Sequence, residues 1–188
     1  MRIVIVGGVA GGMSTAARAR RLDESAEIIV LERGDDVSFA NCGLPYHVAD
    51  EIERRSDLLL HTPESLKASL DLDVRIRSEV TAIDPVGRTI STSQGKAAYS
   101  RLVLALGADA VRLPLQGDAA DRVLSVNDLQ DYAAFRERLQ GARRVTVIGA
   151  GLIGCEFAND LIAAGYEVDV VDPGTQPLGR LLPPEAGD

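Results

Sequence analysis

Two glycine-rich segments have the residue types and the spacing that hold the pyrophosphate of a dinucleotide. The second segment has glycine at all three positions of the GxGxxG pattern, in the run Gly149, Ala150, Gly151, Leu152, Ile153 and Gly154. Glycines at such a turn leave backbone N–H groups and a helix N-terminus open to phosphate oxygens. Asp172 ends the next apolar run, where a carboxylate can bind a ribose and would repel a 2′-phosphate. We therefore expect NADH here in preference to NADPH, and a tight turn that binds nothing is the alternative.

The first segment departs from the pattern at one position. It reads Gly7, Gly8, Val9, Ala10, Gly11 and Gly12, so a valine stands where the middle glycine is expected. Its side chain should hold a pyrophosphate a little further from the backbone. Glu32, about 20 residues beyond Gly12, is at the right separation to bind a ribose. The sequence therefore predicts a second dinucleotide site, with an empty turn as the alternative.

Cys42 is the candidate for redox chemistry. It lies in the segment from Ser38 to Tyr46, directly after Asn41. Asn41 is predicted to cap a short helix, which would place Cys42 in the first turn, where the helix dipole favours the thiolate. A small residue packed in the core is the alternative of equal weight. Cys155 is predicted to pack between a helix and a sheet.

The two turns must be positioned by strands and helices of a repeated unit. Short apolar runs predict strands at Arg2–Val6 and Glu27–Leu31, with a helix over residues 13–22 between them. The same order recurs with strands at Arg144–Ile148 and Glu167–Val171 and a helix over 155–164. Two βαβ units predict an α/β protein with two Rossmann-like domains, which we place at residues 1–112 and 113–188.

The sequence between and after these units is less regular. Strand candidates at 74–77, Val80–Asp84 and Thr89–Thr92 predict a small antiparallel meander. Residues 102–106 predict a further buried strand. The last stretch, 173–188, has four prolines and no periodicity, and the second unit alone supplies only two strands of a sheet. We therefore expect both domains to be incomplete.

Composition excludes several classes of function. The chain has 188 residues, of which 46% are hydrophobic and 26% charged, as in globular proteins. A formal net charge of −8 argues against a nucleic-acid partner, and no apolar run approaches the roughly 20 residues of a membrane span. The two cysteines have neither disulfide-framework nor metal-ligand spacing, so no metal site is predicted and the cytosol is the simplest compartment. His47 and His61 are expected to be solvated loop residues.

The residues from Gly7 to Gly12, Glu32 and the segment from Ser38 to Tyr46 resemble one known family. This is the single-cysteine branch of the pyridine nucleotide-disulfide oxidoreductases, with coenzyme A-disulfide reductases, NADH oxidases, NADH peroxidases and persulfide reductases. In that branch the first turn tolerates a middle residue other than glycine. The resemblance implies FAD in the first domain, NADH in the second, a three-layer ββα architecture in both, and Cys42 beside the flavin as the catalytic residue.

The resemblance also implies contacts and partners. Glu156 would lie near the nicotinamide, and FAD would contact the first turn together with Glu32, Arg33, Ser38, Asn41, Val80, Ala105, Leu106 and Gly107. NADH would reduce the flavin, which would pass two electrons to oxidised Cys42, held as a mixed disulfide, persulfide or sulfenic acid. The substrate would be a small disulfide, including one derived from coenzyme A, a persulfide or an oxygen species. The complete enzyme would be a homodimer formed by a domain absent here, and this chain alone should hold FAD weakly.

Two alternatives to this function stay open. From about residue 102 onward, and most clearly in the runs 149–160 and 177–184, the sequence is similar to rubredoxin reductases, which lack the Cys42 motif. An electron-transfer reductase for a rubredoxin- or ferredoxin-like protein is therefore the first alternative. A nucleotide-binding chain without catalysis is the second. The helix with Arg18, Arg20 and Arg21 is expected to be a solvated face, with a patch for the phosphates of coenzyme A as the lesser alternative.

Overall fold

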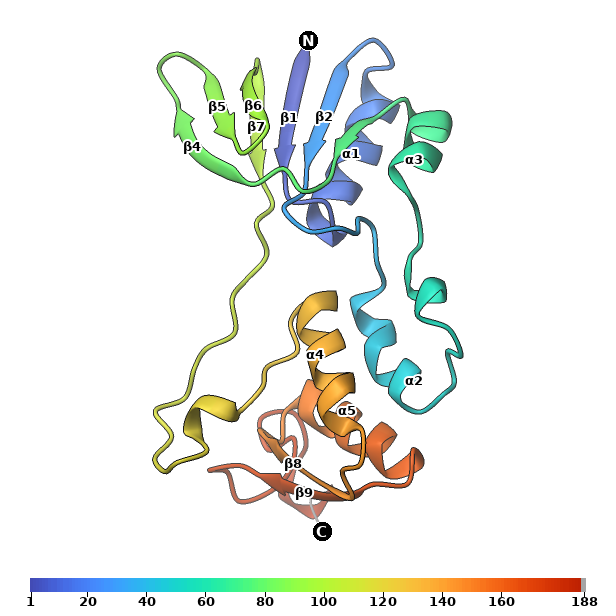
Figure 1. Cartoon of the computed structure of the whole chain (residues 1–188), viewed down its shortest axis with the longest axis vertical. Coiled ribbons are helices and arrows are strands. Elements are labelled where there is room, and N and C mark those ends of the chain that lie inside the picture. Colours follow the sequence, from blue (N-terminus) through green and yellow to red (C-terminus); the bar gives the residue numbers. More distant parts are fainter. Residues whose placement is uncertain (187–188) are drawn as a thin grey trace. The chain divides into compact units, whose positions relative to one another are not determined.

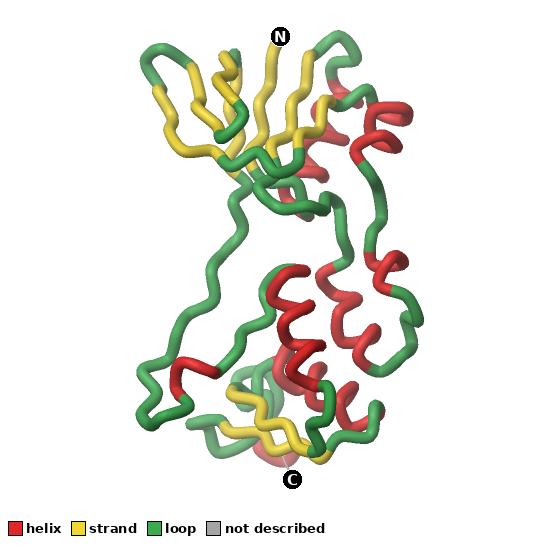
Figure 2. The backbone as a smooth tube through the Cα atoms, viewed as in Figure 1, coloured by secondary structure: helices red, strands yellow, loops and turns green. Residues whose placement is uncertain are grey.

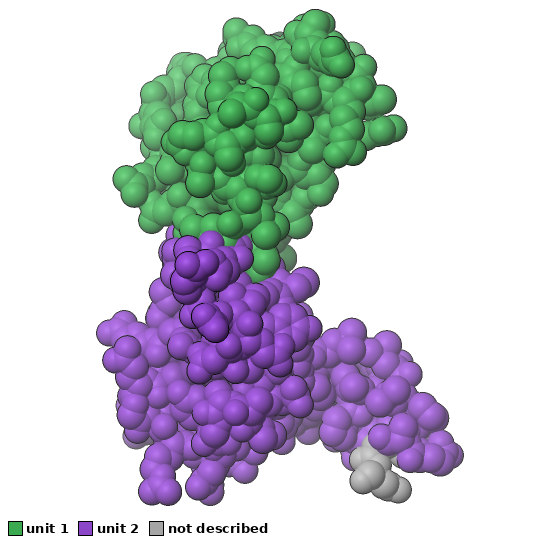
Figure 3. All heavy atoms as spheres, turned by 90° about the vertical axis from the view of Figure 1, so that its right-hand side faces the viewer, with its two compact units in different colours: residues 1–40, 59–111 green, residues 41–58, 112–188 purple. Residues whose placement is uncertain are grey.

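The computed structural model describes residues 1–186 and divides into two compact units, coloured separately in Figure 3. Unit 1 contains Met1–Ala40 and Leu59–Val111, and unit 2 contains Asn41–Leu58 and Arg112–Asp188. The segment that carries Cys42 therefore packs with the second half of the chain. The assignment of residues 1–112 to FAD and 113–188 to NADH concerns binding, and it stays a prediction.

Unit 1 is built on a four-stranded sheet with the order β3-β2-β1-β7, in which every neighbouring pair is parallel. Its elements, shown in Figure 1, are β1 (Arg2–Val6), α1 (Ala10–Leu22), β2 (Glu27–Leu31), α3 (Pro63–Leu70), β3 (Asp73–Arg75), β4 (Val80–Asp84), β5 (Thr89–Thr92), β6 (Gly95–Ala98) and β7 (Arg101–Leu104). In β1 and β2 every residue after the first is buried, as their continuous apolar runs predict for strands covered on both faces.

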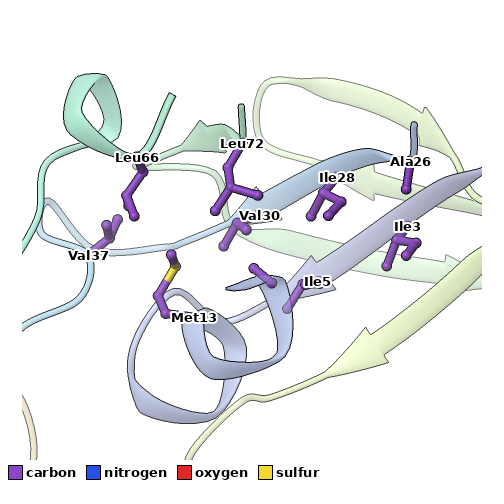
Figure 4. Close-up of a cluster of buried hydrophobic side chains, with 10 residues drawn as sticks. Ile3, Ile5, Met13, Ala26, Ile28, Val30, Val37, Leu66 and Leu72 are labelled. Atoms are coloured by element: carbon purple, nitrogen blue, oxygen red, sulfur yellow. The ribbon is translucent and has the colours of Figure 1, made fainter. Parts of the chain in front are cut away.

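Each face of this sheet has its own layer. Figure 4 shows Ile3, Ile5, Ile28 and Val30 on one face, packed against residues such as Met13 of α1 and Leu66 of α3. The other face presents Val4, Ile29 and Leu31 to Ile90 of β5, which is fully buried. Unit 1 thus has a meander, a parallel sheet and helices as three layers, which confirms the predicted ββα architecture.

The meander differs in composition from the prediction. It consists of β4, β5 and β6, all antiparallel, whereas the predicted strand at 74–77 is β3 and lies parallel to β2. Val74 and Ile76 pack against the core on the helix side of the sheet, which explains why this run joins the main sheet. The strand β6 was not predicted, because Gly95, Lys96 and the two alanines that follow have little β-propensity.

Unit 2 contains the second βαβ unit and two further helices. Its elements are α2 (Leu44–Val48), α4 (Leu129–Leu139), β8 (Arg144–Ile148), α5 (Leu152–Ala163) and β9 (Glu167–Val171). The strands β8 and β9 pair in parallel, and both appear in yellow in Figure 2. Helix α5 packs on both strands and on α2. Both α1 and α5 begin three residues earlier than predicted, inside the glycine turns. No helix among residues 1–186 has the length and apolar character of a membrane span.

Helix α1 approaches the end of β1 closely because Gly12 has no side chain. A Cβ at Gly12 would lie 1.7 Å from the carbonyl oxygen of Gly7. Gly12→Ala should therefore lower the free energy of unfolding by about 1–3 kcal/mol, the usual cost of overpacking. Chemical denaturation measures this change.

The adjacent Gly11 provides the matched control. A Cβ there would meet only the Cβ of Ala105, at the ordinary contact distance of 3.7 Å. Because alanine favours a helix over glycine by about 0.5–1 kcal/mol, Gly11→Ala should be neutral or stabilising. Equal destabilisation by both substitutions would contradict the close-approach explanation.

Candidate functional site

The first corner joins β1 to α1 at Gly7. The Gly7 amide donates a hydrogen bond to the Leu31 carbonyl at 2.8 Å, and Gly7 has a φ of +104°, which favours glycine. A Cβ at Gly7 would also lie 2.0 Å from the carbonyl oxygen of Ala105. The chain after β7 therefore passes directly against this corner.

Glu32 fastens the corner to the loop that follows β2. Its Oε2 accepts a hydrogen bond from the Gly8 amide at 2.7 Å, and its Oε1 accepts one from the Gly34 amide at 2.7 Å. Hydrogen bonds to a carboxylate are roughly twice as strong as neutral ones. The acid predicted to bind a ribose thus also positions the backbone on either side of it.

A cavity of about 680 Å³ opens beside this corner, entirely within unit 1. Six residues predicted to contact a nucleotide line it, namely Gly7, Glu32, Arg33, Val80, Leu106 and Gly107. Ser78 lines it too and was missed by the sequence analysis. Ser78 is 1% exposed, and its hydroxyl has no hydrogen-bond partner among the residues that the structure describes. The volume suits a ligand of nucleotide size.

The second corner, between β8 and α5, has the same hydrogen bonds as the first. The Gly149 amide donates to the Val171 carbonyl at 2.8 Å, and Gly149 has a φ of +111°. A Cβ at Gly154 would lie 1.9 Å from the Gly149 carbonyl oxygen, as at Gly12. A Cβ built on Gly151 would have no other atom within 4 Å, so the corner is open at this residue.

Asp172 takes the place of Glu32 in unit 2. Its Oδ2 accepts from the Ala150 amide at 2.8 Å and its Oδ1 from the Gly174 amide at 2.7 Å. These two hydrogen bonds hold the pKa of Asp172 below its usual value, so the carboxylate is charged at neutral pH. A glycine two residues after each acid, Gly34 and Gly174, is a repeat that alignment of the two halves of the sequence could have found.

The repeat continues into the loop after each acid. The Ser38 amide donates to the Gly8 carbonyl at 2.8 Å, and the Leu178 amide donates to the Ala150 carbonyl at 2.8 Å. Both residues have left-handed backbone conformations, with φ of +51° and +54°. Ser38 is therefore held at the first corner by its backbone. In the second corner Leu152 and Ile153 are exposed at the start of α5.

Cys42 and Asn41 belong to unit 2 and are both exposed. The structure therefore contradicts the alternative that Cys42 packs in the core. The predicted cap is wrong, because Asn41–Gly43 is itself a 3₁₀ turn, and α2 begins after Gly43 without a side-chain cap. Cys42 precedes α2 instead of lying in its first turn, so a helix dipole gives no ground for thiolate character. Cys155 is partly buried in α5, with its Sγ 3.5 Å from the Ala150 carbonyl oxygen.

His47 is not the solvated loop residue that the sequence predicted. It lies in α2, partly buried, with its Nδ1 2.6 Å from the hydroxyl oxygen of Tyr132 in α4. Burial lowers the pKa of His47, and the positive charge of Arg136 lowers it further. Burial also raises the pKa of Tyr132 to about 12. This neutral pair fixes the helix that follows Cys42 to α4.

A second contact joins the Cys42 segment to the second corner. The negative charge of Glu156 in α5 raises the pKa of the Tyr46 hydroxyl in α2, and these two helices pack together. Glu156, predicted to lie near a nicotinamide, is thus placed beside α2.

In unit 1, Arg20 is not part of a free basic patch, because it donates to the carbonyl oxygens of Leu70, Glu24 and Asp71.

The pKa of His47 makes the stability of unit 2 depend on pH. In the unfolded chain this histidine has its ordinary pKa of 6.5, and in the folded chain its pKa is lower. Below that value the unfolded state binds more protons, so the free energy of unfolding falls as the pH falls. The advantage of wild type over His47→Gln should therefore shrink between about pH 8 and pH 5 in denaturation experiments.

His61→Gln, which changes an exposed histidine, is the control for that experiment. If His61→Gln changes the pH dependence of stability as much as His47→Gln does, the burial of His47 is not its cause.

Comparisons with known proteins agree with this geometry. The sequence profile described as pyridine nucleotide-disulphide oxidoreductase matches residues 1–188. The chain is 40% identical to a rubredoxin-NAD(+) reductase of Alcanivorax borkumensis, covering 99% of this chain and 48% of the relative. It is 35% identical to a coenzyme A disulfide reductase of Staphylococcus haemolyticus, covering 90% of this chain and 40% of the relative.

A solved structure shows the same relationship. A NAD-dependent persulfide reductase from A. fulgidus matches 98% of this chain with a TM-score of 0.90 and 31% identity, over 36% of its own length. The chain thus spans less than half the length of each of these three proteins.

Proposed function

Since this chain belongs to the pyridine nucleotide-disulphide oxidoreductase family, we propose that it carries the two nucleotide sites and the redox-active cysteine of an FAD-dependent NADH oxidoreductase. The repeated corner supports this proposal most directly. The same four backbone and carboxylate hydrogen bonds recur around Gly7 and around Gly149. A chain with two such corners is suited to bind two nucleotides.

The residues present fit FAD at the first corner. Gly7 and Gly12 place no side chain in the glycine turn. The adjoining cavity has room for an adenosine between Glu32 and Val80. In the proposal, backbone amides of the corner bind the pyrophosphate and Glu32 binds the ribose. Bound FAD would supply a two-electron carrier between a nicotinamide and sulfur. Arg33, Ser38, Asn41, Ala105, Leu106 and Gly107 complete the proposed contacts.

The residues of the second corner fit NADH. Gly149, Gly151 and Gly154 leave the cradle open, and charged Asp172 would bind the ribose hydroxyls. A fixed negative charge at this position would repel the 2′-phosphate of NADPH. Glu156 would lie near the nicotinamide, with its negative charge close to the Tyr46 hydroxyl.

Cys42 is the proposed redox-active centre. Its exposed thiol can reach a small disulfide or persulfide. The thiolate would attack one sulfur of a disulfide, form a mixed disulfide and release the other half as a thiolate, which takes a proton from water. Two electrons and a proton from NADH balance the reaction, giving NAD⁺, the second thiol and the regenerated Cys42 thiolate. A disulfide derived from coenzyme A, a persulfide and an oxygen species are the proposed acceptors.

The proposed setting follows from charge and cysteine chemistry. Both cysteines are free thiols, as in proteins of the reducing cytosol. The net charge of −8 supports small molecules, and neither nucleic acid nor a membrane surface, as partners. A homodimer of the complete enzyme remains a prediction.

One observation favours a second candidate function. Identity to the rubredoxin-NAD(+) reductase, at 40%, exceeds identity to the coenzyme A disulfide reductase, at 35%. The alternative is an NADH-dependent reductase that passes electrons to a rubredoxin- or ferredoxin-like protein. That reaction does not require Cys42.

Replacement of Cys42 separates the two functions. In the whole protein, Cys42→Ser should abolish NADH-dependent disulfide or persulfide reduction, because serine cannot form a mixed disulfide. Reduction of a ferricyanide-type electron acceptor should persist. Cys155→Ser, which changes the other thiol, should retain both activities. Undiminished disulfide turnover in Cys42→Ser would refute the thiol mechanism and favour the electron-transfer alternative.

Coenzyme preference tests the assignment of Asp172. Steady-state kinetics of the whole protein should give a kcat/KM for NADH at least about tenfold above that for NADPH, equivalent to about 1.4 kcal/mol. Equal values would contradict the assignment. A purified protein that binds neither FAD nor NADH would refute the proposed function as a whole, whereas binding without turnover would favour the alternative of a noncatalytic nucleotide-binding chain.

A further inference from the structure

A partly buried hydrogen bond joins the helix that follows Cys42 to α4. The Nδ1 atom of His47 lies 2.6 Å from the hydroxyl oxygen of Tyr132, and the two rings meet edge to face with their centroids 5.5 Å apart. Tyr132 is 2% exposed, and Arg136, also in α4, donates to the carbonyl oxygen of His47 at 3.5 Å. The redox chemistry proposed for Cys42 uses none of these side chains.

Helix α2 needs such contacts because it is too short to be stable alone. It has five residues, whereas isolated helices of fewer than about 12 residues are marginal in water. Its apolar residues Leu44 and Val48 are buried, and the helix packs on α5. His47 adds a polar contact, with α4. The conformation of α2 therefore depends on its packing in unit 2.

Cys42 depends on α2 in turn. It lies in the 3₁₀ turn Asn41–Gly43, which runs directly into α2 and packs against it. Gly43 is buried, although the Cys42 thiol is exposed. The chain enters unit 2 at this same turn, directly after Ala40 of unit 1. The place of the thiol in unit 2 is therefore set through α2.

We propose that His47 and Tyr132 are positioning residues for Cys42. Their hydrogen bond holds α2 against α4, and α2 holds the turn that presents the thiol to an oxidised substrate. Tyr132 extends this support to α5, because its ring contacts Phe135, and Phe135 contacts Phe157 edge to face at 6.0 Å. The inference rests on the proposed function for the redox role of Cys42.

Protonation of His47 should weaken this support. The groups that face its ring are Tyr132 and Arg136 of α4, Asp50 of the turn after α2, and Arg55 of the next 3₁₀ turn. Burial lowers the pKa of His47 most, the two arginines lower it further, and Asp50 acts in the opposite direction. The charged form is therefore disfavoured in the folded chain, so α2 should detach more often as the pH falls below the ordinary histidine pKa of 6.5.

Hydrogen exchange in the whole protein tests the first step. The amides of Ala49 and Glu51 donate to carbonyl oxygens of α2 and report on its opening. Tyr132→Phe keeps the ring and removes the hydroxyl, so these amides should exchange about fivefold faster, the effect of one lost hydrogen bond. Tyr99→Phe, which removes a hydroxyl that is hydrogen-bonded within unit 1, is the matched control and should leave them unchanged.

Turnover measures whether the pair positions Cys42. Tyr132→Phe should lower kcat for NADH-dependent disulfide or persulfide reduction and leave ferricyanide reduction unchanged, because only the first reaction needs the thiol. His47→Ala should act like Tyr132→Phe, whereas His47→Asn, whose amide can replace Nδ1 as the partner of Tyr132, should retain turnover. Between about pH 7 and pH 5, wild type should lose protection of the α2 amides and His47→Asn should keep it, because asparagine does not titrate.

Unchanged exchange of the α2 amides in Tyr132→Phe would overturn the proposal, and so would faster exchange with unchanged disulfide turnover. A wild-type protein without disulfide turnover would refute the proposed function instead. The rate at which iodoacetamide alkylates Cys42, measured in a Cys155→Ser background, then decides the positioning role. A rate altered by Tyr132→Phe and not by Tyr99→Phe supports that role, and equal rates contradict it.

Discussion

Both halves of this chain depend on a corner where a strand turns into a helix with no room for a side chain. At Gly12 and at Gly154 the helix backbone lies so close to the preceding turn that a Cβ would fall within 2 Å of a carbonyl oxygen. This approach brings the N-terminus of each helix to the end of the first strand. The same absence of side chains leaves backbone amides exposed to an anion.

The corners are stabilised from the following strand and loop. Each acid binds one amide of the turn and one amide two residues after itself, and each loop returns a further amide to the turn carbonyl. In unit 1 that returning residue is Ser38, whose carbonyl also accepts the Leu60 amide at 3.0 Å. An antiparallel bridge between Phe39 and Leu59 lies beside it. The residues before and after the Cys42 segment are therefore both anchored at the first corner.

The features that the sequence predicted correctly are those set by a short stretch of residues. Continuous apolar runs identified β1, β2, β8 and β9, and glycine spacing identified both corners. Pairing was harder to predict, because Val74 and Ile76 join the main sheet through contacts with residues distant in sequence. The contact of His47 with Tyr132, 85 positions away, leaves no local signal. The predicted helix cap at Asn41 was wrong because Asn41 is itself part of a 3₁₀ turn.

Both corners are proposed to bind the ADP portion that FAD and NADH share. Titration of isotope-labelled protein with ADP, followed by amide NMR shifts, tests it most directly. We expect saturable shifts at Val9 to Gly12 and at Gly151 to Gly154, with the amides of Gly8 and Ala150 still bonded to their acids. Shifts confined to other surfaces, with both glycine turns unchanged, would contradict it.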